Sequence, residues 1–197
     1  MMLVELTPIQ SAALPVAAFK DHLRLGSGFS DDAVQDGILE SFLRAAVAAI
    51  EARTGKVLFE RQFGWTLTAW RNVDRQALPL APVSAVTDVI AIDAVGYEES
   101  VTPAWIIEKD DHRPVLVATG STLPRIPQNG SVRIEMVAGF GAWADVPADL
   151  AQAVLMLAAY FYEYRHEAGM SGQELPYGIT ALIEKYRIVR TIAGGRS

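Results

Sequence analysis

Residues 147–168, PADLAQAVLMLAAYFYEYRHEA, are the stretch around which the rest of the chain is organised. Between Ala153 and Tyr162 this stretch has no charged or amide side chain. A bilayer span needs roughly 20 apolar residues, and this run is about half as long, so it predicts a buried helix. Pro147 suits the first turn of a helix, and Asp149 places a negative charge where the helix dipole favours one.

Apolar side chains follow helical spacing on two sides of this predicted helix. One set is Leu150, Val154, Leu157, Phe161 and Tyr164, and the other is Ala151, Leu155, Ala158 and Tyr162. A single neighbouring layer cannot cover both sides. We therefore expect the helix to lie at the centre of a packed assembly, within one subunit or between several. The candidates for core or intersubunit packing are Leu155, Tyr160, Tyr162 and Tyr164.

Composition argues against several classes of protein. The 197 residues carry a net charge of −6, whereas a dedicated nucleic-acid-binding protein is expected to have a basic face. Cysteine is absent, so the chain can have no disulfide, thiolate nucleophile or cysteine-bound zinc. The start, MMLVELTPIQ, lacks the basic and apolar segments of a signal peptide, and no export is predicted.

The remaining pattern predicts an α+β protein. Helical spacing recurs over residues 14–25, 30–54 and 175–190, and Thr54-Gly55 ends the second of these helices. The predicted fold is a bundle of about four helices with a small antiparallel β-sheet inserted between the second and third long helices. The expected units are the N-terminal helices (1–56), the β insert (57–142), the C-terminal helices (143–190) and a flexible tail (191–197).

Within the insert, alternating or β-branched residues predict short strands. The expected strands are residues 65–70, 83–92, 105–108, 115–117 and 131–138. Asn129-Gly130 is the strongest hairpin signal in the chain. Gly139, Phe140 and Gly141 are expected to turn the chain from the last strand into the central helix.

Two groups of residues have part of the pattern of a metal or catalytic site, but neither has the full set of residues. Glu163 and His166 have the spacing of a carboxylate-bridged di-iron site, but such a site needs a second pair and the chain has three histidines. Asp110, Asp111 and His112 are adjacent, a pattern more typical of a polar turn between strands. Neither group favours catalysis, and no cofactor is expected. A helical metalloenzyme using Glu163 and His166 remains an alternative.

Four passages, read in order, resemble the head–tail connector (adaptor) family of tailed bacteriophages and gene transfer agents. They run from about Leu14 to Arg190, almost the whole chain. The passages are AAFKDHLRL, DDAVQDGILESFLRAAVAAIEARTGKVL, VRIEMVAGFGAWADVPADLAQAVLMLAAYFYEYRHEA and ELPYGITALIEKYR.

The resemblance implies a structural protein of the virion neck, assembled in the bacterial cytoplasm, with no enzymatic role. Such proteins form a ring, expected to be twelve-fold, beneath the portal protein. The ring extends the DNA channel and offers a docking surface to the next neck or tail-side protein. The family's C-terminal region commonly reaches the portal, which implies an interface at Tyr186, Arg187, Arg190 and Arg196.

The residues themselves are compatible with a ring but do not establish one. A helix with two apolar sides can serve both a core and a head-to-tail seam, and an acidic protein suits a channel through which DNA passes without sequence-specific binding. Another neck or tail-completion protein of the same particle, and a free cytoplasmic oligomer, remain alternatives.

Overall fold

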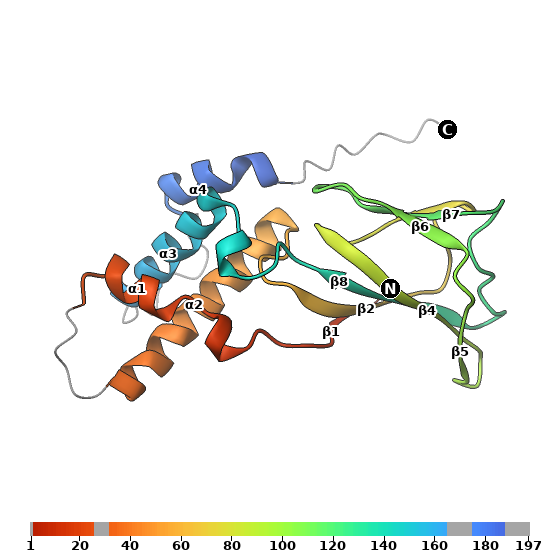
Figure 1. The fold of residues 1–197 in the computed structure, drawn as a ribbon, viewed down its shortest axis with the longest axis horizontal. Helices are drawn as coiled ribbons and strands as arrows, with labels where there is room; N and C mark the ends of the chain where they lie inside the picture. Colours follow the sequence, from red (N-terminus) through yellow and green to blue (C-terminus); the bar gives the residue numbers. More distant parts are fainter. Residues whose placement is uncertain (1, 26–31, 165–174, 188–197) are drawn as a thin grey trace.

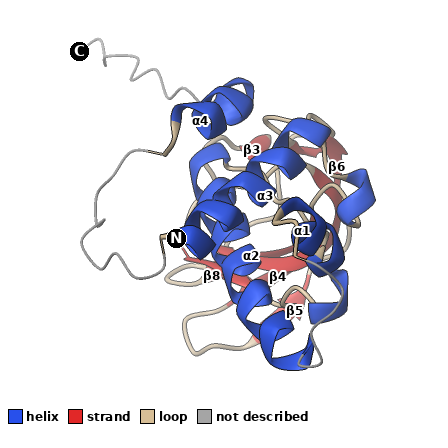
Figure 2. Ribbon diagram, turned by 90° about the vertical axis from the view of Figure 1, so that its left-hand side faces the viewer, coloured by secondary structure: helices blue, strands red, loops and turns tan. Residues whose placement is uncertain are grey.

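The computed structural model describes residues 2–25, 32–164 and 175–187. Its helices lie at one end of the molecule and its strands at the other (Figure 1). Figure 2 views the molecule from the helical end, with the strands behind the helices. The described residues contain α-helices and antiparallel sheets, which confirms the predicted α+β class.

The helices come from both ends of the chain. The described residues form α-helices, labelled α, and short 3-10 helices, labelled η. They are η1 (Ser11–Ala13), α1 (Val16–His22), α2 (Asp32–Thr54), η2 (Trp143–Asp145), α3 (Ala148–Glu163), α4 (Tyr177–Ile183) and η3 (Glu184–Tyr186). The central helix α3 has Pro147 as its N-cap, next to the position expected from the sequence. Gly55, with a φ of 66°, follows α2, as the sequence predicts for a helix end.

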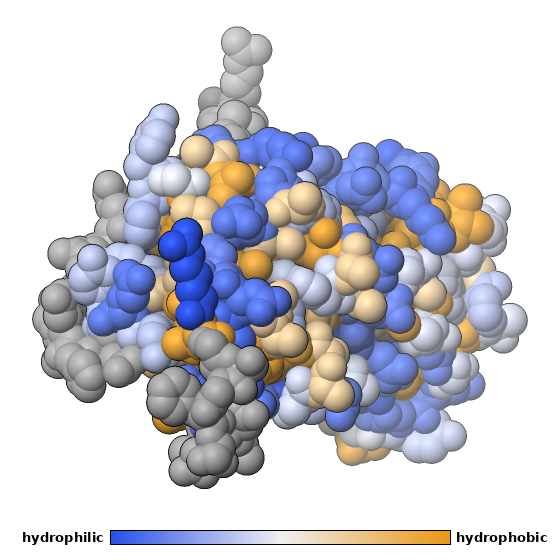
Figure 3. Space-filling model, turned by 60° about the vertical axis from the view of Figure 1, so that its left-hand side comes forward, coloured by the Kyte–Doolittle hydropathy of each residue, from blue (hydrophilic) through white to orange (hydrophobic). Residues whose placement is uncertain are grey.

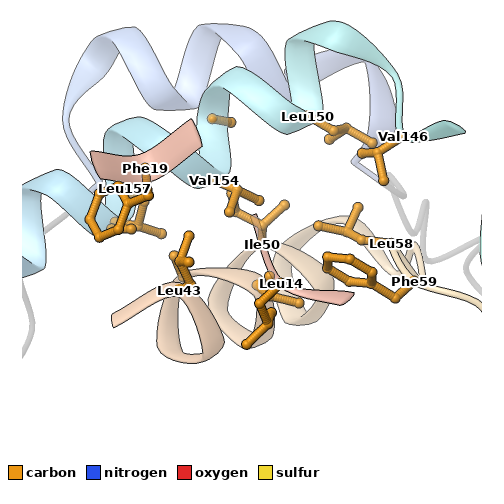
Figure 4. Packing of buried hydrophobic residues seen from close by; sticks show 14 of the residues in the cluster. Leu14, Phe19, Leu43, Ile50, Leu58, Phe59, Val146, Leu150, Val154 and Leu157 are labelled. Atoms are coloured by element: carbon orange, nitrogen blue, oxygen red, sulfur yellow. The ribbon is translucent and has the colours of Figure 1, made fainter. Parts of the chain in front are cut away.

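The helical core forms where α3 packs against α2, with α1 and α4 alongside. Figure 4 shows Leu43 and Ile50 of α2 facing Val154 and Leu157 of α3 across this core. Each of these side chains is at most 1% exposed. Removing one such leucine or isoleucine side chain typically costs about 2–5 kcal/mol, so this contact is a major source of stability.

The strands of the described residues form two sheets, whereas the sequence predicted one. The five-stranded sheet has the order β1-β2-β8-β4-β5 and the three-stranded sheet has the order β3-β7-β6, with all pairs antiparallel. The bounds are β1 (Met2–Glu5), β2 (Arg61–Leu67), β3 (Arg75–Ala77), β4 (Val83–Ile92), β5 (Glu98–Ser100), β6 (Trp105–Glu108), β7 (Val115–Ala118) and β8 (Ser131–Ala138).

A second hydrophobic core is built from residues of both sheets. In β8, Val132, Ile134 and Met136 are buried, while the residues between them are half-buried. This alternation is what a strand with one covered face requires. Leu116 of β7, in the other sheet, belongs to the same cluster and is fully buried.

Two glycines make the turn from β8 toward α3. Gly139 has a φ of 132° and Gly141 a φ of 127°, a region that L-residues rarely adopt. A Cβ on Gly139 would lie 2.5 Å from the carbonyl oxygen of Phe59, so the two backbones approach closely there. The predicted role of this segment as a turn is confirmed.

The predicted hairpin at Asn129-Gly130 is wrong. The two residues do make a turn, in which the Gly130 N–H donates to the Pro127 carbonyl at 3.0 Å. However, β8 then pairs with β2 and β4, while β7, the strand before the turn, pairs in the other sheet. The turn therefore connects two sheets, because the partners of β8 come from earlier in the chain.

A buried ionic contact joins the helical layer to the five-stranded sheet. Arg61 of β2 lies 2.5 Å from Glu51 of α2 and 2.9 Å from Glu5 of β1, measured from guanidinium nitrogen to carboxylate oxygen. Burial is the main reason that the pKa of Glu51 is raised, against the opposing effect of Arg61. This contact ties the ends of three elements together.

None of the helices in the described ranges is both long enough and apolar enough to cross a bilayer.

Candidate interaction surfaces

The last described turn of the chain is held against the start of α3. Ile179 and Ile183 of α4 are buried in the helical core. After them, the Tyr186 hydroxyl donates to Asp149 Oδ1 at 2.8 Å, and Lys185 Nζ lies 2.7 Å from Asp149 Oδ2. We call Asp149, Lys185 and Tyr186 the C-terminal anchor. It sets the point from which residues 188–197 continue.

The anchor favours the charged form of Asp149. Burial by itself would raise the pKa of Asp149, but the bonds from Lys185, Tyr186 and the Leu150 backbone N–H together outweigh it, and the pKa lies below its ordinary value. The bond to Asp149 is also the main reason that the pKa of Lys185 is raised. Burial, followed by the same contact, raises the pKa of Tyr186.

The turn between β6 and β7 reaches the anchor from the three-stranded sheet. His112 stacks on the Tyr186 ring, with centroids 6.5 Å apart and an interplanar angle of 26°. Asp110 Oδ1 accepts from the backbone N–H groups of His112 and Arg113, at 2.6 Å each. Chiefly because of these two bonds, the pKa of Asp110 is lowered. The interpretation of the Asp110–His112 segment as a polar turn is confirmed.

The predicted partner-binding residues are only partly visible. Tyr186 is half-buried in the anchor, and Arg187 is exposed, with its guanidinium 3.1 Å from Glu184. Arg190 and Arg196 lie outside the described residues. An open pocket of about 550 Å³ lies beside Arg187. Its lining is Arg53, Leu175, Tyr177, Thr180, Ile183 and Arg187.

The predicted packing residues lie along the margin of the helical core. Leu155, Tyr160 and Tyr162 are half-buried and pack against the core cluster, while Tyr164 is 43% exposed. Tyr162 meets Phe42 of α2 edge-on, with ring centroids 5.9 Å apart. Figure 3, a view from the helical side, shows apolar residues as small patches among hydrophilic ones.

The alternative metal site does not come together in the part of the chain that is described. Glu163 is exposed at the end of α3, and His166 lies outside the described residues. Over residues 2–25, 32–164 and 175–187, no cluster of three or more histidine, aspartate or glutamate side chains could hold a metal ion.

No protein-family model and no curated protein matches the chain. Solved structures do resemble the chain, and three of them match it over almost its whole length. One is described as the neck of an empty gene transfer agent particle computed with C6 symmetry; it has 52% identity, a TM-score of 0.90 and full coverage of both chains. Another, the neck of a native particle computed with C12 symmetry, has 47% identity, a TM-score of 0.85 and full coverage of both chains. The third, the virion of a native gene transfer agent particle, has 50% identity and a TM-score of 0.87, covering 98% of this chain and 99% of that one.

The chain belongs to the head–tail connector family of tailed bacteriophages and gene transfer agents. The similarity extends through the described helices and both sheets of the connector.

Sequence reasoning missed the anchor of this connector. In the sequence, Asp149 is distinctive only for its place in the first turn of the predicted central helix. Asp149 and Tyr186 are 37 positions apart, so no local pattern could indicate their contact. The only available signal was the acidic residue near Pro147, which a helix dipole explains equally well.

Proposed function

We propose that this connector is a structural protein of the neck of a gene transfer agent or phage particle, lying between head and tail. The observation that carries the proposal is the full-length similarity, at 47% and 52% identity, to chains in two neck structures. In this role the protein acts through its contacts with other subunits and catalyses no reaction.

The connector forms a homo-oligomeric ring, twelve-fold and seated beneath the portal protein. The C6 and C12 symmetries of the related neck structures support a ring. Cyclic symmetry requires head-to-tail contacts, in which two different surfaces of the same subunit meet. In this arrangement the helices within residues 1–56 and 143–190 form the helical bundle, residues 57–142 form the inserted module, to whose sheet β1 is added, and residues 191–197 form the tail.

The ring continues the DNA channel and offers a docking surface to the tail-side protein. The net charge of −6 supports a channel that does not bind DNA tightly, because tight binding to phosphates needs clustered cations. DNA would pass without sequence-specific contacts.

The C-terminal region reaches the portal, with Tyr186, Arg187, Arg190 and Arg196 as the contact residues. The anchor supports this proposal, because it fixes the position of Tyr186 and hence the starting point of the following segment. The tail then orders on the portal, and interface contacts offset the loss of chain entropy.

Deleting the residues after Arg187 tests the portal contact. We expect particles whose heads lack the connector and carry no tails, counted by electron microscopy. A matched control replaces Arg190 and Arg196 with lysine, which preserves length and charge, and should assemble at least partly. Heads that join tails normally after the deletion would refute the portal contact.

Imaging the neck decides between this role and that of another neck or tail-completion protein. The connector should be found directly below the portal, in the same number of copies as the portal. A position elsewhere in the neck, or a different copy number, would favour the alternative role.

A further inference from the structure

Exposed apolar residues gather at two places on the five-stranded sheet, the outer strand β1 and the turn that leads into the other outer strand, β5. At one edge lies β1, and its ladder partner among the described residues is β2. The apolar residues of this edge are exposed on both faces of the strand, each to between 41% and 60%. They are Met2, Leu3, Val4 and the adjacent Leu6. Natural sheets usually shield such an edge with charges or a bulge. An apolar, open edge strand therefore indicates a contact with another chain.

The opposite edge of the same sheet ends in the hairpin between β4 and β5. Val95 is 89% exposed and Tyr97 is 68% exposed at its tip. The turn is well ordered, because Asp93 Oδ1 accepts from the N–H of Val95 at 2.9 Å and of Tyr97 at 2.8 Å. A pre-ordered turn loses little entropy on binding, and tyrosine is frequent among the residues that dominate interfaces.

Two of the charged groups near these edges already have partners within the subunit. Glu5 of β1 contacts Arg61 at 2.9 Å. At the other edge, Glu98 of β5 receives two bonds from Arg133, at 2.8 and 2.6 Å. These two carboxylates can therefore enter an interface without becoming newly unpaired charges, which would be costly.

We infer that the seam between neighbouring subunits joins the β1 edge of one copy to the β4–β5 hairpin of the next copy. This inference depends on the proposed ring. A cyclic ring needs two different surfaces on opposite sides of each subunit, and the strand order places these two apolar surfaces at opposite edges of one sheet. Among the described residues, the ladder partner of β5 is β4, so both edges also offer backbone groups to an incoming strand.

Cysteine cross-linking tests the seam directly, since the natural chain has no cysteine. Particles are assembled from a Val4→Cys, Val95→Cys double variant and oxidised, and the chains are separated without reductant. We expect a ladder of covalent oligomers, because each copy would link to the next. Either single variant should remain monomeric, since head-to-tail contacts bring different residues together. A second double variant, Leu3→Cys with Tyr97→Cys, would detect the same seam if the two strands meet in a shifted register.

The control pair is Val4→Cys with Ile106→Cys. Ile106 is 55% exposed but lies on β6 of the other sheet, so this pair should give no ladder. If neither seam pair forms a ladder in particles whose necks contain a ring of this connector, the seam is elsewhere and the proposed function stands. If the natural chain is absent from the neck, the proposed function fails and the seam inference fails with it.

A substitution gives a second, independent measurement. Tyr97→Asp should lower incorporation into necks at least tenfold, while the melting temperature of the isolated subunit stays unchanged because the side chain is exposed. Normal incorporation of Tyr97→Asp would overturn the inference.

Discussion

Arg61 is the residue on which the contact between the helices and the five-stranded sheet depends most directly. Its side chain is 6% exposed, and it lies between the carboxylates of Glu5 and Glu51. It also lies over the Phe63 ring, with its guanidinium carbon 5.2 Å from the ring centroid. A buried cation with two carboxylate partners is costly to remove, because the carboxylates are left uncompensated.

We predict that Arg61→Met lowers the free energy of unfolding by about 3 kcal/mol, measured by urea denaturation at pH 7. The loss should be smaller at pH 5, because without Arg61 burial raises the folded-state pKa of Glu51 further, and protonation then neutralises the carboxylate that the substitution leaves uncompensated. Glu5→Gln is the matched control, with an expected loss below about 1 kcal/mol since Glu5 is more exposed. Equal losses for the two variants would contradict this account.

The lowered pKa of Asp149 leads us to expect that acid weakens the C-terminal anchor. The pKa of Asp149 is lowered in the folded state, so its contribution to stability is present above its unfolded pKa of about 4 and is lost as the pH falls through the folded pKa. We therefore expect faster amide hydrogen exchange in α4 at pH 3 than at pH 6, after correction for intrinsic rates. In Asp149→Asn, exchange in α4 should depend much less on pH. An unchanged dependence in that variant would assign the acid response to another group.

Among the elements, the turn between β8 and α3 leaves no room for a side chain at Gly139. Gly139→Ala should cost about 3 kcal/mol or more, because a methyl group would meet the Phe59 carbonyl in a backbone region that alanine avoids. Gly37 in α2 provides the matched control: its added Cβ meets nothing within 4 Å. Gly37→Ala should therefore stabilise the protein by about 0.5–1 kcal/mol, as in other exposed helix positions. Both changes in the free energy of unfolding would be measured by urea denaturation. A loss well below about 3 kcal/mol for Gly139→Ala would show that the turn can relax.

The central helix shows what apolar spacing can and cannot decide. Its buried residues include Leu150, Val154 and Leu157 from the first predicted set and Ala158 from the second. Periodicity correctly indicated that both sides are apolar. It could not indicate how far α1, α2 and α4 cover them, because those helices come from distant parts of the chain.

At the scale of the whole molecule, the two hydrophobic cores share no buried residue. One belongs to the helices and the other to the sheets, and they meet where Val57, in the sheet core, precedes Leu58 and Phe59, in the helical core. Substitutions deep in different cores should thus act independently, because distant sites without shared partners usually do.

We predict that Leu157→Ala and Ile134→Ala each destabilise the connector by about 2–5 kcal/mol. Their effects should add to within about 0.5 kcal/mol in the double variant, measured by urea denaturation. Strong coupling between them would mean that the two cores form one packed unit.

Local patterns were sufficient to place four of the eight strands of the described residues, β4, β6, β7 and β8. The predicted bounds of β4, β6 and β8 agree with the structure, because alternation and β-branched residues are properties of the strand itself. Strand β1 was missed, since Met2–Glu5 is exposed on both faces and has no alternation to detect. It is a strand because it pairs with β2, some sixty positions later in the chain.

The sequence by itself determined the class of the fold, the central buried helix, the glycine turn that precedes it and, through four ordered passages, the family. All of these depend on residues that are near one another in the chain. The tertiary structure alone decided that the described strands divide into two sheets, that Asp149 binds Tyr186, and that the apolar strand β1 and the β4–β5 hairpin lie at opposite edges of one sheet. Those features join residues far apart in the chain, and the selection among possible partners comes from burial and hydrogen bonding in the whole fold, which no local spacing records.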